Sequence, residues 1–443
     1  MYNATYPPIQ RSLDLLQRAE RCIPAQTQTL AKGPRQHVRG VAPVYARRGK
    51  GAYLWDVDDN RYLDYSMAIG PVILGYADPG VNRAIEQQLH DGITFSLMHP
   101  LEVEVAEMLH GIVPNAENIR FSKTGCDVTT AAVRLARAYT GRSTILCCGY
   151  HGWHDWYIAT TDRAMGIPTA VRDLTFTFNY NDIQSVYEAI DADTAAIILE
   201  PMVFDEPDNN FLQELRELCT QRGIVLIFDE MWTGFRISPG GAQMRFGVQA
   251  DLACFSKAIA NGMPLSALTG KAEIMRLLEH DVFFFTTFGG EALSLAAAKA
   301  TLHRIIDGEV LQRIELLGDE LRDGVRSTLA ANDVTYASVK GLGPRTMLSF
   351  SDSVEDPLLL RSFMQQELLR NGILWNGFHT LSASHTKHDI QYTLDVYAEL
   401  IPMMHEHVRM GTLSLALRGK PVEPVFRKTG GFNTKPKMAG VNR

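Results

Sequence analysis

The sequence predicts an α/β protein with a large domain, built on a mostly parallel sheet, and a smaller α+β domain. Its 443 residues exceed what one hydrophobic core usually organises. From about residue 70, short apolar runs of the buried-strand kind alternate with stretches of helical spacing. We therefore expect an N-terminal segment, 1–69, that is part of the smaller domain, a large domain at 70–310, and a small C-terminal domain at 311–443 with a basic tail.

The first sixty residues contain one expected helix and one expected hairpin. The helix covers Arg11–Arg21, and a connector rich in Gly, Pro and Arg follows around 32–41. Apolar and polar residues alternate in 52–58 and again in 61–65, with a turn signal at Asp58-Asp59-Asn60. This alternation predicts a β-hairpin ahead of the large domain.

The large domain shows the pattern of a parallel sheet with helical crossovers. Its expected strands are Ser143–Cys148, Ala195–Leu199, Ile224–Phe228 and Leu252–Phe255. Stretches of helical spacing cover Val103–Leu109, Val128–Tyr139 and Gln213–Gln221. The last of these lies between two strands, as the helix of a βαβ unit does.

A long helix is expected to lead into the smaller domain. It covers Ala292–Arg322, with an interruption near Asp307-Gly308. The stretch after Gly411 is basic, and Glu423 is its only acid. We expect this tail to be solvated or packed on a partner, and a nucleic-acid-binding arm is the alternative.

Composition and charge exclude several classes of protein. The formal net charge is -7, from 43 Lys and Arg against 50 Asp and Glu, so we expect no binding to nucleic acid or to an anionic membrane. No run reaches the roughly 18 apolar residues of a membrane helix, and Met1–Pro8 lacks the profile of a secretory signal. A cytoplasmic location with reduced cysteines is therefore expected.

Motifs of several other chemistries are absent from the sequence. There is no Gly-x-x-x-x-Gly-Lys-Ser/Thr, no Gly-x-Gly-x-x-Gly after a strand, no Gly-x-Ser-x-Gly and no His-Glu-x-x-His. His151 and His154 are three residues apart, but no second pair of ligands accompanies them. No metal site is expected.

Three polar residues closely follow expected strands of the large domain: Glu200, Asp229 and Lys257. Ligands of parallel sheets bind at the carboxyl ends of the strands, so an acid and a lysine can face one pocket. Such a lysine can form a Schiff base with an aldehyde cofactor, and an aspartate can keep a pyridine nitrogen protonated. A structural ion pair is the alternative.

A phosphate could bind where a helix begins, because the first N–H groups there are free and the helix dipole favours an anion. Thr124-Gly125-Cys126 precedes the helix expected from Val128, and Thr286–Gly290 precedes the next long helix. Both segments can instead be ordinary helix caps. Tyr150, at the end of an expected strand, is a candidate to stack on a cofactor ring.

The ordered set of these motifs resembles the class III pyridoxal-phosphate aminotransferases, and most of all their glutamate-1-semialdehyde aminomutase branch. The motifs are Thr124–Asp127, Arg134–Arg142, Tyr150-His151-Gly152, Glu200-Pro201, Asp229-Glu230, Thr233–Arg236, Lys257 and Thr287. The resemblance covers residues 35–400 approximately. It implies PLP fold type I, pyridoxal 5'-phosphate as the cofactor, and a homodimer with shared active sites.

The resemblance also implies roles around the cofactor ring. Lys257 would carry the cofactor as a Schiff base and transfer protons, and Asp229 would pair with the pyridine nitrogen. Tyr150 would stack on the ring with His151 close by, and Glu200 would lie near its edge.

The phosphate contacts are implied in the same way. The backbone amides of Gly125 and Cys126 would bind the phosphate, beside the Thr124 hydroxyl. Thr287 would reach the phosphate of the partner subunit's cofactor.

Two departures from the branch favour a transaminase with two substrates. The segment Trp153–Asp173 is poor in the glycine that forms the lid of the aminomutase, and His379 stands where the aminomutase has a carboxylate. We therefore expect a ping-pong aminotransferase with L-glutamate as the donor. The alternatives are an aminomutase, a decarboxylase or epimerase, and a non-catalytic binding module of the same fold.

The acceptor is predicted from residues that are expected near the substrate. Arg39 aligns with the arginine that receives a substrate carboxylate in relatives, and Arg236 is a second candidate. A polar pocket of Asn376, His379 and His385 would suit a keto or aldehyde sugar, such as an oxidised octulosonate. A surface role for Arg39 and a bracing role for Arg236 are the alternatives.

Overall fold

The computed structural model describes residues 5–208, 210–424 and 432–437. The chain forms two compact units. Unit 1 contains the described residues up to Asp78 together with those from Gln312 to 424, and unit 2 contains Pro79–Leu311 and the C-terminal segment 432–437.

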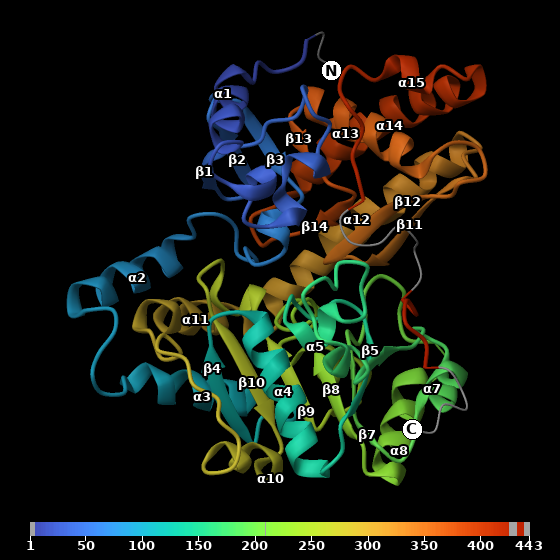
Figure 1. Ribbon diagram of the computed structural model, residues 1–443. Helices are drawn as coiled ribbons and strands as arrows, with labels where there is room; N and C mark the ends of the chain where they lie inside the picture. Colours follow the sequence, from blue (N-terminus) through green and yellow to red (C-terminus); the bar gives the residue numbers. More distant parts are fainter. Residues whose placement is uncertain (1–4, 209, 425–431, 438–443) are drawn as a thin grey trace. The chain divides into compact units, whose positions relative to one another are not determined.

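Unit 2 is built on a seven-stranded sheet in the order β4-β10-β9-β8-β7-β5-β6 (Figure 1). Neighbouring strands from β9 to β6 are parallel, and only β10 runs antiparallel to its neighbours. The strands are β4 (Asn118–Ser122), β5 (Thr144–Cys148), β6 (Thr175–Thr177), β7 (Thr194–Leu199), β8 (Val225–Asp229), β9 (Leu252–Phe255) and β10 (Ser266–Gly270). The predicted α/β class with a mostly parallel sheet is confirmed.

Among the described residues, six helices lie between consecutive strands, as expected for crossovers between parallel strands: α4 (Gly125–Thr140), α5 (Asp155–Ile158), α6 (Thr169–Arg172), α7 (Ile183–Ala189), α8 (Phe211–Arg222) and α9 (Gly241–Phe246). The helices α2 (Pro79–Asp91) and α3 (Pro100–Ile112) precede β4, and α10 (Ala272–Met275) and α11 (Ala292–Ile305) follow β10. The apolar face of α4 packs across the sheet and forms the core of unit 2 with strand residues such as Ile198 and Ile227. The helix expected near Val128 therefore begins three residues earlier, at Gly125.

Unit 1 combines a four-stranded sheet, β1-β2-β3-β13, with a three-stranded sheet, β11-β12-β14. The expected hairpin is present as β2 paired antiparallel with β3. The strands are β1 (Ala46–Lys50), β2 (Tyr53–Asp56), β3 (Arg61–Asp64), β11 (Ala337–Leu342), β12 (Arg345–Phe350), β13 (Ile373–Leu374) and β14 (Phe378–Thr380). The helices are α1 (Gln10–Ala19), α12 (Glu309–Ala331, which starts in unit 2), α13 (Pro357–Arg370), α14 (Lys387–Met410) and α15 (Leu413–Ala416).

The C-terminal segment differs from its expected place. The sequence assigned all of 311–443 to the smaller domain, but residues 432–437 pack in unit 2 beside β6, where Lys435 pairs with Thr177. Residues 432–437 of the tail are therefore packed against unit 2 of the same chain and not wholly solvated. In the described part of the chain, no helix is long and apolar enough to span a membrane.

Candidate active site

Four parallel strands of unit 2 end at one edge of the sheet, and each is followed closely by a polar residue. The strands are adjacent, in the order β9-β8-β7-β5. Lys257 follows β9, Asp229 ends β8, Glu200 follows β7, and Tyr150-His151 follows β5. The fold thus gathers five of the predicted site residues where ligands of α/β sheets bind.

Asp229 and His151 form a buried pair at the centre of this edge. The Asp229 carboxylate is 1% exposed, lies 2.8 Å from His151 Nδ1, and accepts a second hydrogen bond from the Met231 amide at 3.1 Å. His151 Nε2 is buried and has no hydrogen-bond partner among the described residues. Because buried polar atoms are normally bonded, this nitrogen indicates a place for a polar ligand.

Glu200 forms the next wall of the site. Its Oε1 accepts a hydrogen bond from the Tyr150 amide at 2.7 Å. Burial raises the pKa of this carboxyl, and the nearby Asp229 charge raises it further, whereas His151 and Lys257 lower it. Gly149 has a φ of 116°, and a Cβ there would lie 2.8 Å from Glu200 Oε1, so this turn requires glycine.

Lys257 starts a short 3-10 turn, Lys257–Ala260, with a φ of 44°. A left-handed conformation is uncommon for lysine, and such strain is concentrated at functional sites. Its Nζ lies 5.3 Å from the centre of the Trp232 ring. The lysine is therefore held by a local backbone turn and an aromatic face at the end of β9.

Arg236 contacts the same tryptophan. Its guanidinium lies 5.3 Å from the Trp232 ring and the residue is 1% exposed, and burial lowers the pKa of the guanidinium to about 10. Such a buried side chain braces the loop after Asp229. It does not present a free charge to a substrate carboxylate, so the bracing role is the one the structure supports.

The N-terminus of α4 forms a cradle at the same edge. The Asp127 carboxylate accepts hydrogen bonds from Ser122 Oγ at 2.7 Å and from the Thr124 amide at 2.8 Å. The amides of Gly125 and Cys126 begin the helix and have no intrahelical acceptor. A Cβ at Gly125 would lie 2.9 Å from Met231 Sδ. The first turn thus offers amide donors in a space that a side chain at position 125 would crowd.

Thr124 and Cys126 flank this glycine. Thr124 is exposed and Cys126 is partly exposed. Burial raises the pKa of the Cys126 thiol, so the thiol stays neutral beside a bound anion. The second phosphate candidate, Thr286–Gly290, is different: the helix after it is capped by Glu291, whose carboxylate accepts from Leu293 N at 2.6 Å. The Glu291 carboxylate already accepts from the first amides of α11, so these amides are not available to a phosphate of the same chain.

Tyr150 presents a ring to the space above these groups. The residue is 46% exposed, and burial of its hydroxyl raises its pKa to about 12, so it stays a neutral phenol. Tyr157 packs edge-on against it at 5.5 Å and against His151 at 5.4 Å, and donates to the Gly149 carbonyl at 2.8 Å. Tyr157 and Trp232 were not among the predicted site residues; for Tyr157, the aromatic run Trp153–Tyr157 was an available signal.

The two candidate substrate histidines of unit 1 have hydrogen-bond partners inside that unit. His379 is fully buried, with Nδ1 3.0 Å from Thr346 Oγ1 and Nε2 2.7 Å from the Tyr397 hydroxyl, and burial lowers its pKa to about 3. His385 is equally buried, with its pKa lowered to about 4. The structure therefore places both histidines in the core of unit 1, where His385 Nε2 and Asn376 Oδ1 have no hydrogen-bond partner among the described residues.

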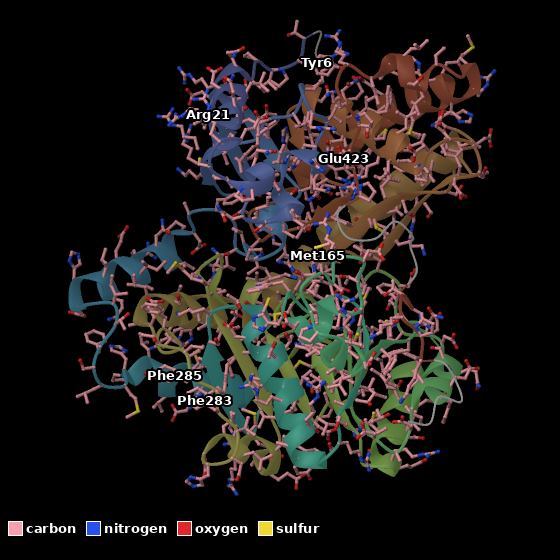
Figure 2. The ribbon with its side chains drawn as sticks, in the orientation of Figure 1. Tyr6, Arg21, Met165, Phe283, Phe285 and Glu423 are labelled. Carbon is pink, nitrogen blue, oxygen red and sulfur yellow. The ribbon has the colours of Figure 1, made fainter. Side chains whose placement is uncertain are left out.

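Arg39 is paired within unit 1. Its guanidinium lies 2.6 Å from Glu423 Oε1, and its backbone pairs with Lys420 (Glu423 is labelled in Figure 2). To receive a substrate carboxylate, Arg39 would have to exchange this partner. This ion pair could not be predicted from sequence spacing, because the two residues are far apart in the chain.

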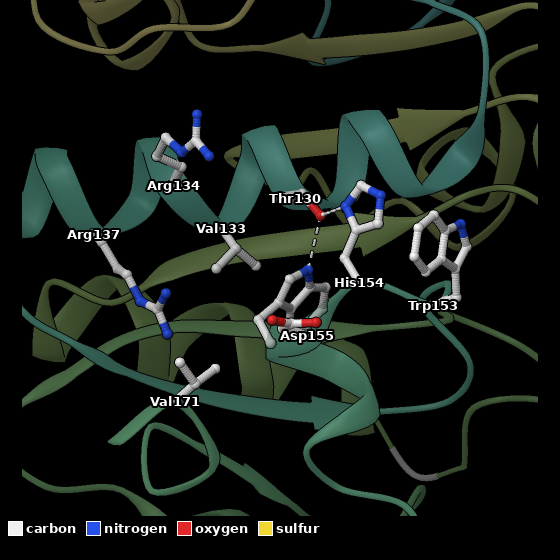
Figure 3. A pocket seen from close by; sticks show the side chains of 9 residues that line it. Thr130, Val133, Arg134, Arg137, Trp153, His154, Asp155 and Val171 are labelled. Atoms are coloured by element: carbon white, nitrogen blue, oxygen red, sulfur yellow. Dashed lines mark hydrogen bonds between the residues drawn. The ribbon is translucent and has the colours of Figure 1, made fainter. Parts of the chain in front are cut away.

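A cavity of about 460 Å³ lies against α4 (Figure 3). Its lining includes Arg134, Arg137, Trp153 and His154 but none of the predicted site residues. His154 is bonded to Thr130 at 2.7 Å, whereas His151 is bonded to Asp229. The two histidines therefore have separate partners and do not form a shared ligand pair.

Together, these features fit a pyridine aldehyde phosphate. Lys257 would hold the aldehyde carbon, Asp229 the ring nitrogen, and the α4 terminus the phosphate, while Tyr150 would cover the ring. The buried, unpartnered His151 Nε2 and the tight approach to Gly125 are the observations of this structure that indicate a ligand here. These are the groups that a Schiff-base enzyme dependent on pyridoxal phosphate requires.

Comparison with known proteins agrees with this site. The chain belongs to the class III aminotransferase family, whose sequence model matches residues 36–387. Glutamate-1-semialdehyde 2,1-aminomutase of Methanothermobacter thermautotrophicus is 34% identical, with 88% of this chain and 99% of that protein covered. 3-Aminobutyryl-CoA aminotransferase of Cloacimonas acidaminovorans is 32% identical, with coverages of 88% and 96%.

A solved structure shares the fold. The FumI protein of Sphingopyxis sp. MTA144, in its pyridoxal-phosphate form, is 30% identical with a TM-score of 0.84 and coverages of 90% and 98%. The predicted family, fold type I and cofactor are thereby confirmed. The protein is a transaminase of class III that depends on pyridoxal phosphate.

Proposed function

We propose that this transaminase takes the amino group of L-glutamate and delivers it to a carbonyl substrate at the same site, in a ping-pong cycle. The observation that supports this most is the grouping of Lys257, Asp229 and His151 at adjoining strand ends. One lysine and one buried acid can serve both half-reactions, because the second half-reaction reverses the chemistry of the first.

When bound, pyridoxal phosphate supplies an aldehyde that takes up the amino group and a ring that withdraws electrons from the reacting carbon. Lys257 Nζ removes a proton from that carbon and returns it, and the Trp232 face stabilises the charged amine. Asp229 holds a proton on the ring nitrogen. His151 fixes the orientation of the Asp229 carboxylate.

The acceptor is a carbonyl compound, and the structure weakens the argument for a sugar. That argument rested on Asn376, His379 and His385, of which both histidines are buried and neutral. One relative is named for 3-aminobutyryl-CoA. In that compound the amino group is on a carbon that is not next to the thioester carbonyl carbon. We therefore propose, as the first acceptors to test, compounds whose reacting carbonyl is not next to the carboxyl or thioester carbon. Sugar aldehydes are the second group to test.

An aminomutase is the second candidate, because relatives with this name are 34% identical. Such an enzyme must retain its intermediate while the amino group moves within one molecule. The segment between Gly152 and β6 contains the helices α5 and α6, and Met165 between them is 96% exposed (Figure 2). This glycine-poor, bulky segment favours exchange of two substrates over retention of one.

The enzyme acts as a homodimer in this proposal. Phe283, Phe285 and Phe288 are 76%, 67% and 58% exposed on the loop before α11, and Figure 2 shows the first two projecting from unit 2. Leu97 and Met98 are more than 80% exposed on a neighbouring segment, where Ala292 N donates to the Ile93 carbonyl. Apolar patches of this kind mark interaction sites. A second copy would cover the patch and bring Thr287 to its cofactor.

The test is an absorption spectrum of the purified holoenzyme before and after L-glutamate. Loss of the visible band with release of 2-oxoglutarate supports the donor half-reaction. A carbonyl panel, added next, then identifies acceptors by return of the band. With glutamate-1-semialdehyde as sole substrate, formation of 5-aminolevulinate without an acceptor would overturn the transaminase proposal in favour of the aminomutase.

A further inference from the structure

The C-terminal segment Phe432–Lys437 lies along the edge of the unit 2 sheet, in red beside the β5 side of the sheet in Figure 1. β6 is the edge strand, and its Thr177 amide donates to the Lys435 carbonyl at 3.0 Å. The Lys435 amide donates back to Thr177 Oγ1 at 2.7 Å, and Thr177 Oγ1 donates to Asn433 Oδ1 at 2.8 Å. The segment therefore covers backbone groups of an edge that would otherwise be open.

Two lysines anchor the segment around Phe176 of β6. Lys435 Nζ donates to the carbonyls of Arg172 and Thr175 and lies 5.0 Å from the Phe176 ring. Lys437 Nζ pairs with Asp191 and lies 5.4 Å from the same ring. The basic character of the tail is thus used inside this chain. These contacts hold the end of α6 and the start of β6 in place.

A third contact leads from the tail toward the active site. Thr434 Oγ1 donates to the carbonyl of the buried Thr160 at 3.0 Å, and Thr160 Oγ1 donates to the Tyr157 carbonyl at 2.8 Å. Tyr157 bonds the Gly149 carbonyl and packs edge-on against both Tyr150 and His151. Three successive contacts therefore connect the tail to the two aromatic residues that face the cofactor.

We propose that Phe432–Lys437 is a positioning element of the active site. It fixes Thr160 and Tyr157, and through them it sets the orientation of Tyr150 and His151. The segment lies outside residues 36–387, the part that the family model matches. Its loss should loosen the segment 153–177 and weaken cofactor binding.

The experiment compares two truncations of the full chain, one without residues 432–443 and a matched control without residues 438–443. Three point variants accompany them: Thr434→Val, Lys435→Met and Lys435→Arg. Two readouts are independent of the amino donor: amide hydrogen exchange over 153–177 in the apo protein, and the dissociation constant for pyridoxal phosphate. The thermal midpoint of each variant is measured alongside, and the midpoint of the visible band's pH titration is a third readout.

The expected result is faster exchange in 153–177 and about fivefold to tenfold weaker cofactor binding for the longer truncation and for Lys435→Met, the size expected for loss of a hydrogen bond. Thr434→Val changes the same readouts in the same direction by less. The shorter truncation matches wild type, and Lys435→Arg recovers part of the loss. The proposal is overturned if the longer truncation lowers only the thermal midpoint, since that would show a merely structural role, or if it changes nothing.

Discussion

Replacement of Asp229 by asparagine tests the electrostatic centre of the site. The change keeps the shape of the side chain but removes a charge from a position that is 1% exposed, and it places a donor amide where the carboxylate accepts from His151 and Met231. Loss of one partner from a buried pair costs about 3–5 kcal/mol. If all of this free energy is lost from the stabilisation of the protonated ring nitrogen, the rate of the half-reaction falls about 10²- to 10⁴-fold, because each 1.36 kcal/mol of activation free energy is a factor of ten.

The assay is a single-turnover half-reaction with L-glutamate, followed by absorbance in a stopped-flow instrument. Variant and wild type are both saturated with pyridoxal phosphate, so that a difference in cofactor affinity does not enter the rate. Asp229→Glu is the matched variant, because it keeps the charge and shifts only its position, and it should retain more activity than the asparagine. A rate for Asp229→Asn within threefold of wild type would refute the role given to this carboxylate.

Further predictions address neighbouring residues. Burial raises the Glu230 pKa from 4.5 to about 7, so the native state binds this proton more tightly than the unfolded state does. The stabilisation that this proton provides is complete below about pH 4.5 and lost as the pH rises to about 7. Between pH 5 and 8, the free energy of unfolding of wild type should therefore fall by about 2–3 kcal/mol more than that of Glu230→Gln, as measured by denaturant titration. Lys257→Ala should abolish the visible Schiff-base band at neutral pH, and a retained band would contradict its assignment. Gly125→Ala should weaken pyridoxal-phosphate binding about tenfold by crowding the α4 terminus, and unchanged affinity by fluorescence titration would remove that cradle from the site. If the proposed homodimer forms, Phe285→Asp should convert it to monomers in light scattering at micromolar concentration; a wild type that is already monomeric would contradict the dimer.

Much of unit 2 could be predicted because local signals and tertiary packing agree there. Uninterrupted apolar runs such as Leu252–Phe255 are fully buried in the sheet, so the pattern and the burial have one cause. Strand ends are also where ligands bind, so the positions of Glu200, Asp229 and Lys257 followed from the same pattern. The roles of individual groups came from the family resemblance, since spacing alone favoured a structural ion pair.

The remaining features depend on contacts that sequence spacing does not reveal. His379 looked like a substrate residue, yet its partners Thr346 and Tyr397 come from other elements of unit 1 and enclose it completely. Arg39 meets Glu423 from the far end of the chain, and Lys435 meets Thr177 in the same way. A polar residue that is fully satisfied by distant partners and one that awaits a ligand have the same appearance in a linear sequence.

The cofactor-binding residues and the substrate-binding residues differ in this respect. The cofactor groups are defined by strand ends of one sheet, which the core holds rigidly, so both sequence and structure identify them. The substrate groups are not defined in this way: Arg39 is paired with Glu423, both histidines are core residues, and the segment 153–173 is bonded to the C-terminal segment 432–437. A search for the acceptor should therefore vary residues of 153–173, such as the exposed Met165, before any residue of the cofactor site. If substitutions at Met165 change the KM for the acceptor but leave the glutamate half-reaction intact, specificity resides in this segment; if they change neither, it resides in residues outside unit 2 or in the second copy.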